Sequence, residues 1–536
     1  IRSGFSGLPV VDDEGMLVGI IARRDMEKAI HHGLQNAPIK SFMSPQIIGV
    51  SPRDSIYTIR NLMVENDIGR VPVIKAGKPI GIITRSDLLR VFHQKENIVV
   101  NELTRLNVSE SVFAHFTAAD LELINLISGF ARRVGVRTYL VGGVVRDIIL
   151  GVPNHDLDLV VEGDAIEFSQ NLNRLLNGKV VAYPPFGTSV VFMKDKKRID
   201  FASARKEFYR FPGAAPDVEY SDLKKDLFRR DFTLNAMAIS IYPDNWGELY
   251  DFFGGYRDLR SKILRILHPL SFVDDPARSI RAVRFEKKYG FHIEPFTMSL
   301  LKQTIRKNLL DSIKPDRLKE EIQLILELPN YYRYLERLYQ LDMIPSILPG
   351  CIWKREYSDR FIDVEKRLPE VKTILGIDRF LYQLTPLFDD FDIKQISLLQ
   401  KRLALSRHFT HKVVSYHSKK SEFRWAIEEK DIRPSEVYLR CRSIPLEFLY
   451  YLLSFYPENS LASQRLNRYL KEWITIKTIL KGSDLQEMGI KAGPHYATML
   501  DELKLAKIDG HAMNRLEEEQ LIRQYWERVK KRGEQR

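Results

Sequence analysis

Two short acidic segments could bind a divalent cation. Asp156 and Asp158 are separated by one leucine in a segment that alternates polar and apolar residues, and Asp200 lies in a second such segment. The alternation predicts that Asp156 and Asp158 share one face of a strand. Carboxylates held so close repel each other, and a cation that prefers oxygen ligands relieves the repulsion. An isolated pair of this kind also fits a solvated strand face, so the neighbouring segments must distinguish a metal site from an ordinary surface strand.

The segments around these acids predict a site for a triphosphate. A strand expected over residues 137–141 leads into Gly142 and Gly143 and then into a helix over residues 144–150. Glycine lets a backbone approach a ligand, and the free amides at a helix start attract phosphate, although many such turns carry glycine for steric reasons alone. Basic clusters follow, among them residues 229–238 and 274–285. With them, three carboxylates holding two Mg²⁺ ions could activate a 3′ hydroxyl and stabilise leaving pyrophosphate.

Asp275 and Arg278 bring together an acid and a guanidinium, which have the chemistry to recognise the edge of a base. They are three residues apart on a predicted helix, so both should point to one side. Cytosine and adenine each present an exocyclic amine, which a carboxylate accepts, beside a ring nitrogen to which a guanidinium donates. Uracil and guanine would leave polar groups unpaired, at a cost of a few kcal/mol. The same two residues could instead form only a local salt bridge.

Taken together, these segments resemble the class II tRNA nucleotidyltransferases, the bacterial CCA-adding and A-adding enzymes and their poly(A) polymerase relatives. The resemblance covers about residues 120–335 and resumes at 481–510. Its motifs are matched by Gly142, Gly143, Arg146, Asp147, Gly151, Asp156, Asp158, the segment 229–236, Asp275 and Arg278, and less specifically by Arg317, Glu320 and Glu321. Asp274 stands where many relatives carry Glu, which keeps the charge and alters the reach.

The resemblance implies a template-independent enzyme that uses Mg²⁺ to add A, or the whole CCA end, to tRNA from ATP and CTP. Asp156, Asp158 and Asp200 become the implied metal ligands and catalytic residues. The implied nucleotide-binding residues are Gly142, Gly143, Arg146, Asp147, Arg205, Arg229, Asp231, Asn235, Asp275, Arg278, Arg281 and Arg284. Segment 206–228 resembles the family's loop for adding the terminal A, which argues against a strictly CC-adding enzyme. A poly(A) polymerase, a CC-adding specialist and a non-catalytic RNA-binding protein that senses adenine nucleotides stay open as alternatives.

An internal repeat with a period of about 62 residues occupies the start of the chain. Residues 8–11 and 18–25 are echoed by 71–74 and 80–87, each as two short strands and a helix start. The block resembles a pair of cystathionine β-synthase (CBS) domains whose first repeat is incomplete. Thr84 and Asp87 match the residues that hold an adenosine ribose in that family, whereas Ala22 replaces the threonine in copy one. Asp25 and Asp87 could also merely cap helices.

The predicted fold is multidomain, α/β followed by all-α. We expect a CBS pair over 1–95, a linker over 96–119, a nucleotidyltransferase head with a mixed or antiparallel sheet over 120–265, a neck with nucleotide-selecting helices over 266–335, a helical body over 336–460 and a helical tail over 461–536. In the tail, Gly493 and Pro494 suit a helix start whose amides could meet a tRNA phosphate, or an ordinary turn between helices.

Composition sets the remaining expectations. The 536 residues are 44% hydrophobic and 28% charged with a formal net charge of +12, which suits a globular protein with a polyanionic partner. Two distant cysteines and no membrane-length apolar stretch predict a cytoplasmic protein with no membrane partner. The incomplete first repeat suggests a missing upstream segment, for which a DHH-type phosphoesterase domain is the implied candidate. A dimer through the CBS pair is a further expectation.

Overall fold

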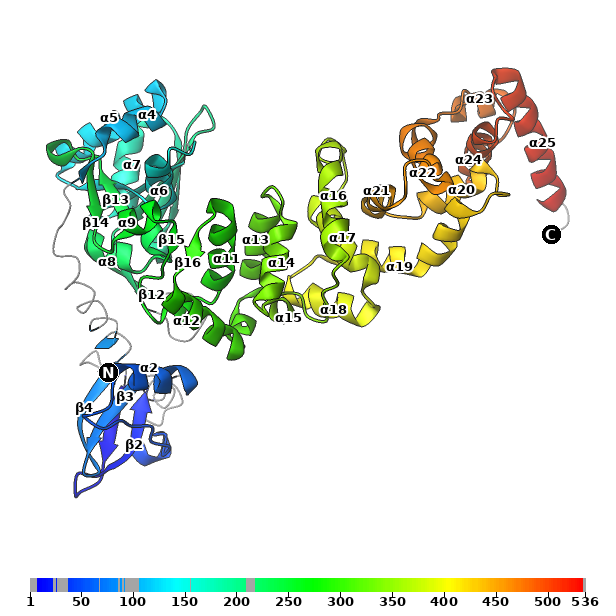
Figure 1. Cartoon of the computed structure of the whole chain (residues 1–536). Helices are drawn as coiled ribbons and strands as arrows, with labels where there is room; N and C mark the ends of the chain where they lie inside the picture. Colours follow the sequence, from blue (N-terminus) through cyan, green and yellow to red (C-terminus); the bar gives the residue numbers. More distant parts are fainter. Residues whose placement is uncertain are drawn as a thin grey trace. The chain divides into compact units, whose positions relative to one another are not determined.

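The computed structural model describes residues 7–22, 26, 37–66, 68–84, 87–88, 91, 106–154, 156–208 and 217–533. The chain divides into two compact units, Ile1–Lys314 and Pro315–Arg536. The first unit combines sheets with helices, whereas the described part of the second unit contains helices without strands (Figure 1). This arrangement confirms the predicted fold class, α/β followed by all-α.

The repeat at the start of the chain forms two antiparallel hairpins. They consist of β1 (Gly7–Val11) with β2 (Leu17–Ala22) and of β3 (Arg70–Lys75) with β4 (Lys78–Thr84). Helix α2 (Ile56–Glu65) packs its buried Ile59 and Met63 with Val71 of β3. Both copies therefore have the expected two strands, and α2 lies between them in the sequence.

An eight-stranded mixed sheet forms the centre of the first unit. Its order is β5 (Leu106–Asn107), β14 (Glu248–Asp251), β13 (Met237–Ser240), β6 (Thr138–Val141), β7 (Leu157–Val161), β10 (Arg198–Ser203), β9 (Thr188–Phe192) and β8 (Lys179–Tyr183). Neighbours β7 and β10 are parallel, and the other pairs in the sheet are antiparallel. The single parallel pair is the one that carries two of the predicted catalytic acids.

Helices and a small hairpin surround this sheet. They are α4 (Ser109–His115), α5 (Ala118–Val134), α6 (Gly143–Leu150), α7 (Ala165–Leu176), α8 (Leu223–Phe228), α9 (Gly255–Arg260) and the hairpin of β11 (Arg205–Phe208) with β12 (Asp217–Tyr220). Phe168 of α7 packs against Phe201 of β10 at a ring distance of 5.7 Å. At the start of α5, the buried Asp120 accepts a bond of 2.7 Å from Lys197, which ties α5 to the turn between β9 and β10.

The first unit ends in short elements around a central helix. They are β15 (Ile263–Leu264), α10 (Ser271–Asp274), α11 (Ala277–Tyr289), β16 (His292–Ile293) and α12 (Pro295–Arg306). Strands β15 and β16 form one parallel pair of two residues each. Helix α11 buries Ile280, Ala282 and Val283, so its arginines are carried by a firmly packed backbone.

The second unit is a succession of helices. They are α13 (Pro315–Leu326), α14 (Tyr332–Gln340), α15 (Ile344–Ile347), α16 (Tyr357–Val371), α17 (Arg379–Asp390), α18 (Ile393–Arg402), α19 (Arg407–Glu428), α20 (Pro434–Arg442), α21 (Leu446–Phe455), α22 (Leu461–Lys471), α23 (Gly482–Glu487), α24 (His495–Ile508) and α25 (Arg515–Gly533). Within the described residues, every helix is too short or too polar to cross a bilayer.

Candidate active site

Parallel pairing brings two of the predicted acids together. Asp158 of β7 is the register partner of Asp200 of β10. Residues paired across neighbouring strands lie about 5 Å apart on the same face of a sheet. The residues on either side of Asp158, Leu157 and Leu159, are buried in the core. The sheet therefore directs both carboxylates to one face.

Asp156 occupies a different position from the one we predicted. Strand β7 begins at Leu157, so the expectation that Asp156 and Asp158 share a strand is wrong. The backbone amide of Asp156 donates to Asn154 Oδ1 at 2.9 Å, a local turn that competes with strand pairing. Asp156 is exposed at the start of the strand, yet its charge still reaches Asp158.

The environment of Asp158 opposes ionisation of its carboxyl group. Burial, followed by the charges of Asp200 and Asp156, raises the pKa of Asp158 to about 6, while Arg230 acts in the opposite direction. Asp200 is held by Arg198, whose Nε and Nη2 donate to the two carboxylate oxygens at 2.7 and 2.6 Å. Among the residues that the structure describes, no group of three or more Asp, Glu, His or Cys side chains is arranged to hold a metal ion. The carboxylate oxygens are the ligands that Mg²⁺ prefers, but Arg198 already donates hydrogen bonds to both oxygens of Asp200.

The predicted strand, glycine turn and helix are confirmed. Strand β6 ends at Val141 and α6 begins at Gly143. Gly142 has a φ of 75°, which favours glycine, and a Cβ there would lie 2.9 Å from Nη1 of Arg230. The turn thus gives Arg230 room beside the helix start, and the same guanidinium is close enough to influence Asp158.

Arg146 and Asp147 of α6 pair with each other, and Arg146 also packs against α11. The Arg146 guanidinium donates to both Asp147 oxygens at 2.8 Å and to Asn235 Oδ1 at 2.9 Å. It also lies 4.7 Å from the centre of the Tyr289 ring. Both residues are buried. These two predicted nucleotide-binding residues therefore join α6 to α11 within the site.

Asp231 connects the predicted arginines to this cluster. It accepts bonds of 2.9 Å from Asn235 Nδ2 and from Arg281 Nη1. Burial opposes its ionisation, but Arg281 and Asn235 overcome that effect and hold the pKa of Asp231 at about 2. Arg284, one turn further along α11, lies over the Phe285 ring at 5.2 Å. Arg281 and Arg284 thus lie on α11, and Asp231 is joined to that helix through Arg281.

Arg205 and Arg229 share acids that the sequence reasoning missed. Glu207 accepts from Arg205 at 3.1 Å and from Arg229 at 2.8 Å. Asp226, which is 0% exposed, accepts from Arg229 at 2.7 Å and from Arg230 at 3.0 Å. Asp226 precedes these arginines by three and four residues, a helical spacing that could have pointed to it. Residues 209–216 of the predicted A-addition loop lie outside the described residues.

Asp275 and Arg278 meet, but on different elements. Helix α11 begins at Ala277, so the expectation that one helix carries both residues is wrong. A residue that precedes proline avoids helical geometry, and Asp275 before Pro276 is extended, with a φ of −133°. Arg278 Nε lies 3.6 Å from Asp275 Oδ2.

The rest of the Arg278 guanidinium is fixed by the protein. It donates to Ser271 Oγ at 2.7 Å and to the backbone carbonyls of Arg229 and Arg230 at 2.7 and 3.1 Å. These bonds join the pair Asp275 and Arg278 to the segment whose Arg230 side chain lies near Asp158. The acid pair and the predicted base-selecting pair therefore meet through residues 229–230.

The remaining predicted site residues lie in other parts of the chain. Gly493 and Pro494 directly precede α24, as expected for a helix start. Near the start of the chain, Thr84 Oγ1 donates to Asp87 Oδ2 at 2.6 Å, and the Asp87 amide donates back to the hydroxyl at 3.2 Å. Reciprocal bonding of this kind is typical of a helix cap, which is the alternative role that the sequence left open for Asp87. Asp25 lies outside the described residues.

Three family models match the chain. The poly A polymerase head domain matches residues 138–265, and the probable RNA and SrmB-binding site of polymerase A matches residues 290–352. The CBS domain matches residues 1–32 and 39–94. All three agree with the resemblances seen in the sequence.

Curated relatives and solved structures agree with these models. The chain is 32% identical to an A-adding tRNA nucleotidyltransferase of Geobacter sulfurreducens over 96% of its own length and 61% of the relative's. It therefore spans less than two thirds of that relative, and 43% of the corresponding enzyme of Aquifex aeolicus. It is 31% identical to the A-adding enzyme of Halalkalibacterium halodurans, of which it covers 92%.

Solved structures match over a similar range. A CCA-adding enzyme in complex with ATP has a TM-score of 0.68 at 33% identity, covering 79% of this chain and 99% of that chain. The Thermotoga maritima CCA-adding enzyme in complex with tRNA has a TM-score of 0.64 at 32% identity, covering 78% of this chain and 99% of that chain. Since sequence identity and fold agree over nearly the full length of several relatives, the chain belongs to the family of tRNA nucleotidyltransferases that includes the A-adding and CCA-adding enzymes.

Proposed function

We propose that the chain adds A, or the nucleotides of the CCA end, to the 3′ end of tRNA, with ATP and CTP as donors. The names of the Geobacter, Aquifex and Halalkalibacterium relatives favour addition of A. The observation that carries the proposal is the connection between Asp158, register partner of Asp200, and the pair Asp275 and Arg278 through residues 229–230. It joins a reaction site to a base-reading site.

In this proposal, Asp156, Asp158 and Asp200 would hold Mg²⁺. When bound, the metal would lower the pKa of the 3′ hydroxyl and stabilise the leaving pyrophosphate. The donor set fits the ion because burial and neighbouring charge make a cation favourable beside Asp158, whose pKa is raised to about 6. Arg198 would have to share or release Asp200.

The other side chains would bind and orient the nucleotide. Arg205 and Arg229 would neutralise phosphate, with Glu207 and Asp226 setting their direction. Asp275 would accept the exocyclic amine of adenine or cytosine, and the Arg278 guanidinium would donate to the ring nitrogen. Because bonds to Ser271 and two carbonyls hold Arg278, the protein settles its orientation before the base arrives.

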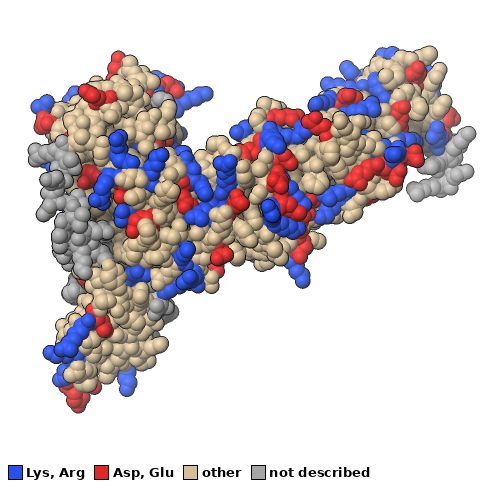
Figure 2. Space-filling model, in the orientation of Figure 1, with Lys and Arg blue, Asp and Glu red and all other residues tan. Residues whose placement is uncertain are grey.

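The second unit would bind the tRNA body. Figure 2 shows Lys and Arg side chains on the visible surface of the second unit, interspersed with Asp and Glu, and the cations suit contact with a polyanion. We further propose that the start of α24, preceded by Gly493 and Pro494, contacts a backbone phosphate of the tRNA through its free amides.

Product length decides among the family's activities. The protein is incubated with tRNAs that lack A, CA or CCA, with ATP, CTP or both, and the products are resolved on a gel. We expect a single A on tRNA that ends in C-C. Two or three additions on the shorter tRNAs would indicate a CCA-adding enzyme.

A poly(A) polymerase is the second candidate, because the matching head model bears that description. Unstructured RNA separates the two activities. Long tails on both tRNA and unstructured RNA would indicate the polymerase and contradict tRNA end addition. A chain that incorporates no nucleotide on any of these RNAs would overturn both.

A further inference from the structure

Asp226 is a buried acid between two arginines at the end of α8. Its side chain accepts from Arg229 Nε and Nη2 at 2.9 and 2.7 Å and from Arg230 Nη2 at 3.0 Å. The side chain is 0% exposed, and the paired guanidiniums are 16% and 18% exposed. A fully buried carboxylate that accepts from two guanidiniums restrains both, since moving either guanidinium away breaks charge-assisted hydrogen bonds in a buried site.

The backbone of these two arginines is the support of Arg278. The carbonyls of Arg229 and Arg230 accept two of the hydrogen bonds that hold the Arg278 guanidinium. The third acceptor, Ser271 Oγ, lies on a separate element, α10. A shift of residues 229–230 would therefore pull Arg278 away from Ser271 or break its bonds to the carbonyls. In both cases its position relative to Asp275 would change.

A second acid limits how far this segment can move. Glu207 of β11 accepts from Arg229, whereas Asp226 accepts from both Arg229 and Arg230. Without the Asp226 carboxylate, the two guanidiniums would lie close together without the acid that both of them contact. Their repulsion would act directly on the peptide units that carry the two carbonyls.

We propose that Asp226 is a positioning residue for base selection, which holds Arg278 in place through the backbone carbonyls of Arg229 and Arg230. The inference rests on the proposed function, in which Arg278 reads the base. Asp226 itself would contact neither the base nor the metal. Its loss would make the enzyme less selective, because a misplaced Arg278 no longer distinguishes the edge of adenine from that of guanine.

The test compares two nucleotides on one protein. For Asp226→Asn in the full chain, kcat/KM is measured with ATP and with GTP on tRNA that ends in C-C. We expect the ratio of ATP to GTP to fall by roughly 10- to 100-fold, as displacement of a positioned group commonly costs. A purely structural role would reduce the folded fraction, which lowers both values equally and leaves the ratio unchanged.

Two further variants keep the result interpretable. Asp222→Asn, at the start of the same helix, removes an exposed acid paired with Lys225 and should leave the ratio unchanged. If Asp226→Asn fails to fold, Asp226→Glu keeps the charge but is one methylene longer, so it should still displace the arginines and lower the ratio. An unchanged ratio in the folded Asp226 variant would overturn the proposal.

Arg278→Gln separates this inference from the proposed function. If Arg278→Gln lowers the ratio and Asp226→Asn does not, Arg278 reads the base and Asp226 does not position it. If Arg278→Gln leaves the ratio unchanged, base reading by Arg278 is wrong and the role of Asp226 fails with it. If the unsubstituted protein adds no nucleotide to tRNA, the proposed function itself fails.

Discussion

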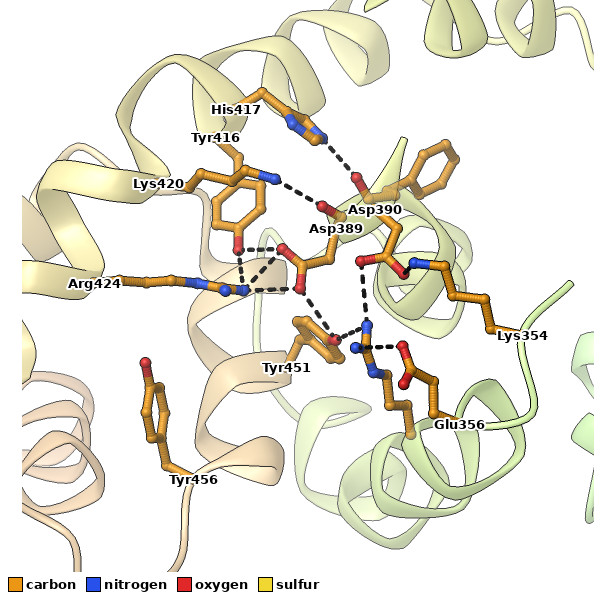
Figure 3. A network of polar contacts seen from close by, with 12 residues as sticks. Lys354, Glu356, Asp389, Asp390, Tyr416, His417, Lys420, Arg424, Tyr451 and Tyr456 are labelled. Atoms are coloured by element: carbon orange, nitrogen blue, oxygen red, sulfur yellow. Dashed lines mark hydrogen bonds and ion pairs between the residues drawn. The ribbon is translucent and has the colours of Figure 1, made fainter. Parts of the chain in front are cut away.

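The two units each bury an aspartate among cations, but the two networks lead to different places. In the first unit, Asp226 pairs with Arg229 and Arg230. In the second unit, Asp389 of α17 accepts from Arg424 at 2.8 Å and from Tyr416 at 2.8 Å, both on α19 (Figure 3). The chemistry of the two buried acids is therefore similar.

The difference lies in what their partners do next. The arginines around Asp226 carry the carbonyls that hold Arg278. Around Asp389, Tyr451 of α21 closes the network at 3.4 Å, and Lys420 donates to the Asp389 carbonyl at 2.8 Å, so the contacts join three helices (Figure 3). A buried ion pair thus suggests a role in the reaction only when its partners lead toward the reacting groups. The following tests examine this contrast.

Asp158→Asn should give the largest effect. We expect nucleotide incorporation to fall by at least about 1,000-fold, because a ligand of the proposed metal is lost. The melting temperature should stay the same or rise, since the raised pKa of Asp158 shows that its ionised form is unfavourable in the folded protein. Primer extension and a thermal melt measure the two effects. Asp195→Asn, an exposed acid on the turn before β10, is the control, and retained incorporation in Asp158→Asn would refute the assignment.

Asp389→Asn should reverse this pattern. Loss of the carboxylate leaves Arg424 uncompensated, and we expect the second unit to lose about 3 kcal/mol of stability. Incorporation at a temperature where the variant stays folded should be preserved. Urea unfolding and primer extension provide the measurements. Asp390→Asn, whose partners Lys354 and Arg360 surround a more exposed acid, should cost less; an equal cost would contradict the contrast.

Acid should weaken the first unit through His268. Burial and the nearby Arg278 charge lower the pKa of His268 to about 3. Below about pH 6.5, His268 becomes protonated in the unfolded chain but stays neutral in the folded protein. The free energy of unfolding therefore falls with falling pH, by about 2 kcal/mol at pH 5. His268→Asn should remove that part of the loss, as measured by urea unfolding at pH 7 and pH 5. The exposed His408→Asn serves as the control, and identical pH dependence in protein and variant would exclude the effect.

Arg198→Gln should give the smallest effect. Arg198 holds Asp200 as Arg424 holds Asp389, but its side chain is 61% exposed. An exposed pair contributes at most about 1 kcal/mol, so freeing Asp200 should raise the affinity for Mn²⁺ by no more than roughly fivefold. Titration of Mn²⁺ followed by electron paramagnetic resonance measures binding without turnover. Lys194→Gln, on the turn before β10, is the control, and weaker binding by Arg198→Gln would show that Arg198 helps to assemble the site.

Local patterns predicted much of the fold around the site. The strand, glycine turn and helix at 137–150, the paired hairpins at the start of the chain and the start of α24 depend on neighbouring residues, and all are found. Two errors arose from a competing local interaction. Asn154 holds Asp156 outside β7, and Pro276 keeps Asp275 outside α11.

Long-range contacts explain what the sequence could not show. Asp226 lies in a segment that resembles an ordinary surface helix with ion pairs three and four residues apart, and only tertiary packing buries it. The pairing of Asp158 with Asp200 depends on the register of two parallel strands whose partners are 42 positions apart in the chain, and alternation within each strand leaves this register open. The hydrogen bonds of Arg278 to carbonyls of residues 229–230 have no side-chain signature at all.

The parallel pair of β7 and β10 makes the spacing of the two acids depend on their apolar neighbours. The apolar face of each strand packs into the core, because its residues are all buried: Leu157, Leu159, Ile199 and Phe201. Because side chains alternate, inserting or deleting a single residue beside Asp200 would turn it into the hydrophobic interior. Insertion or deletion of one residue in β10 should therefore be far more damaging than most substitutions there, and the tolerance of such changes would show how strictly the fold fixes the distance between the two carboxylates.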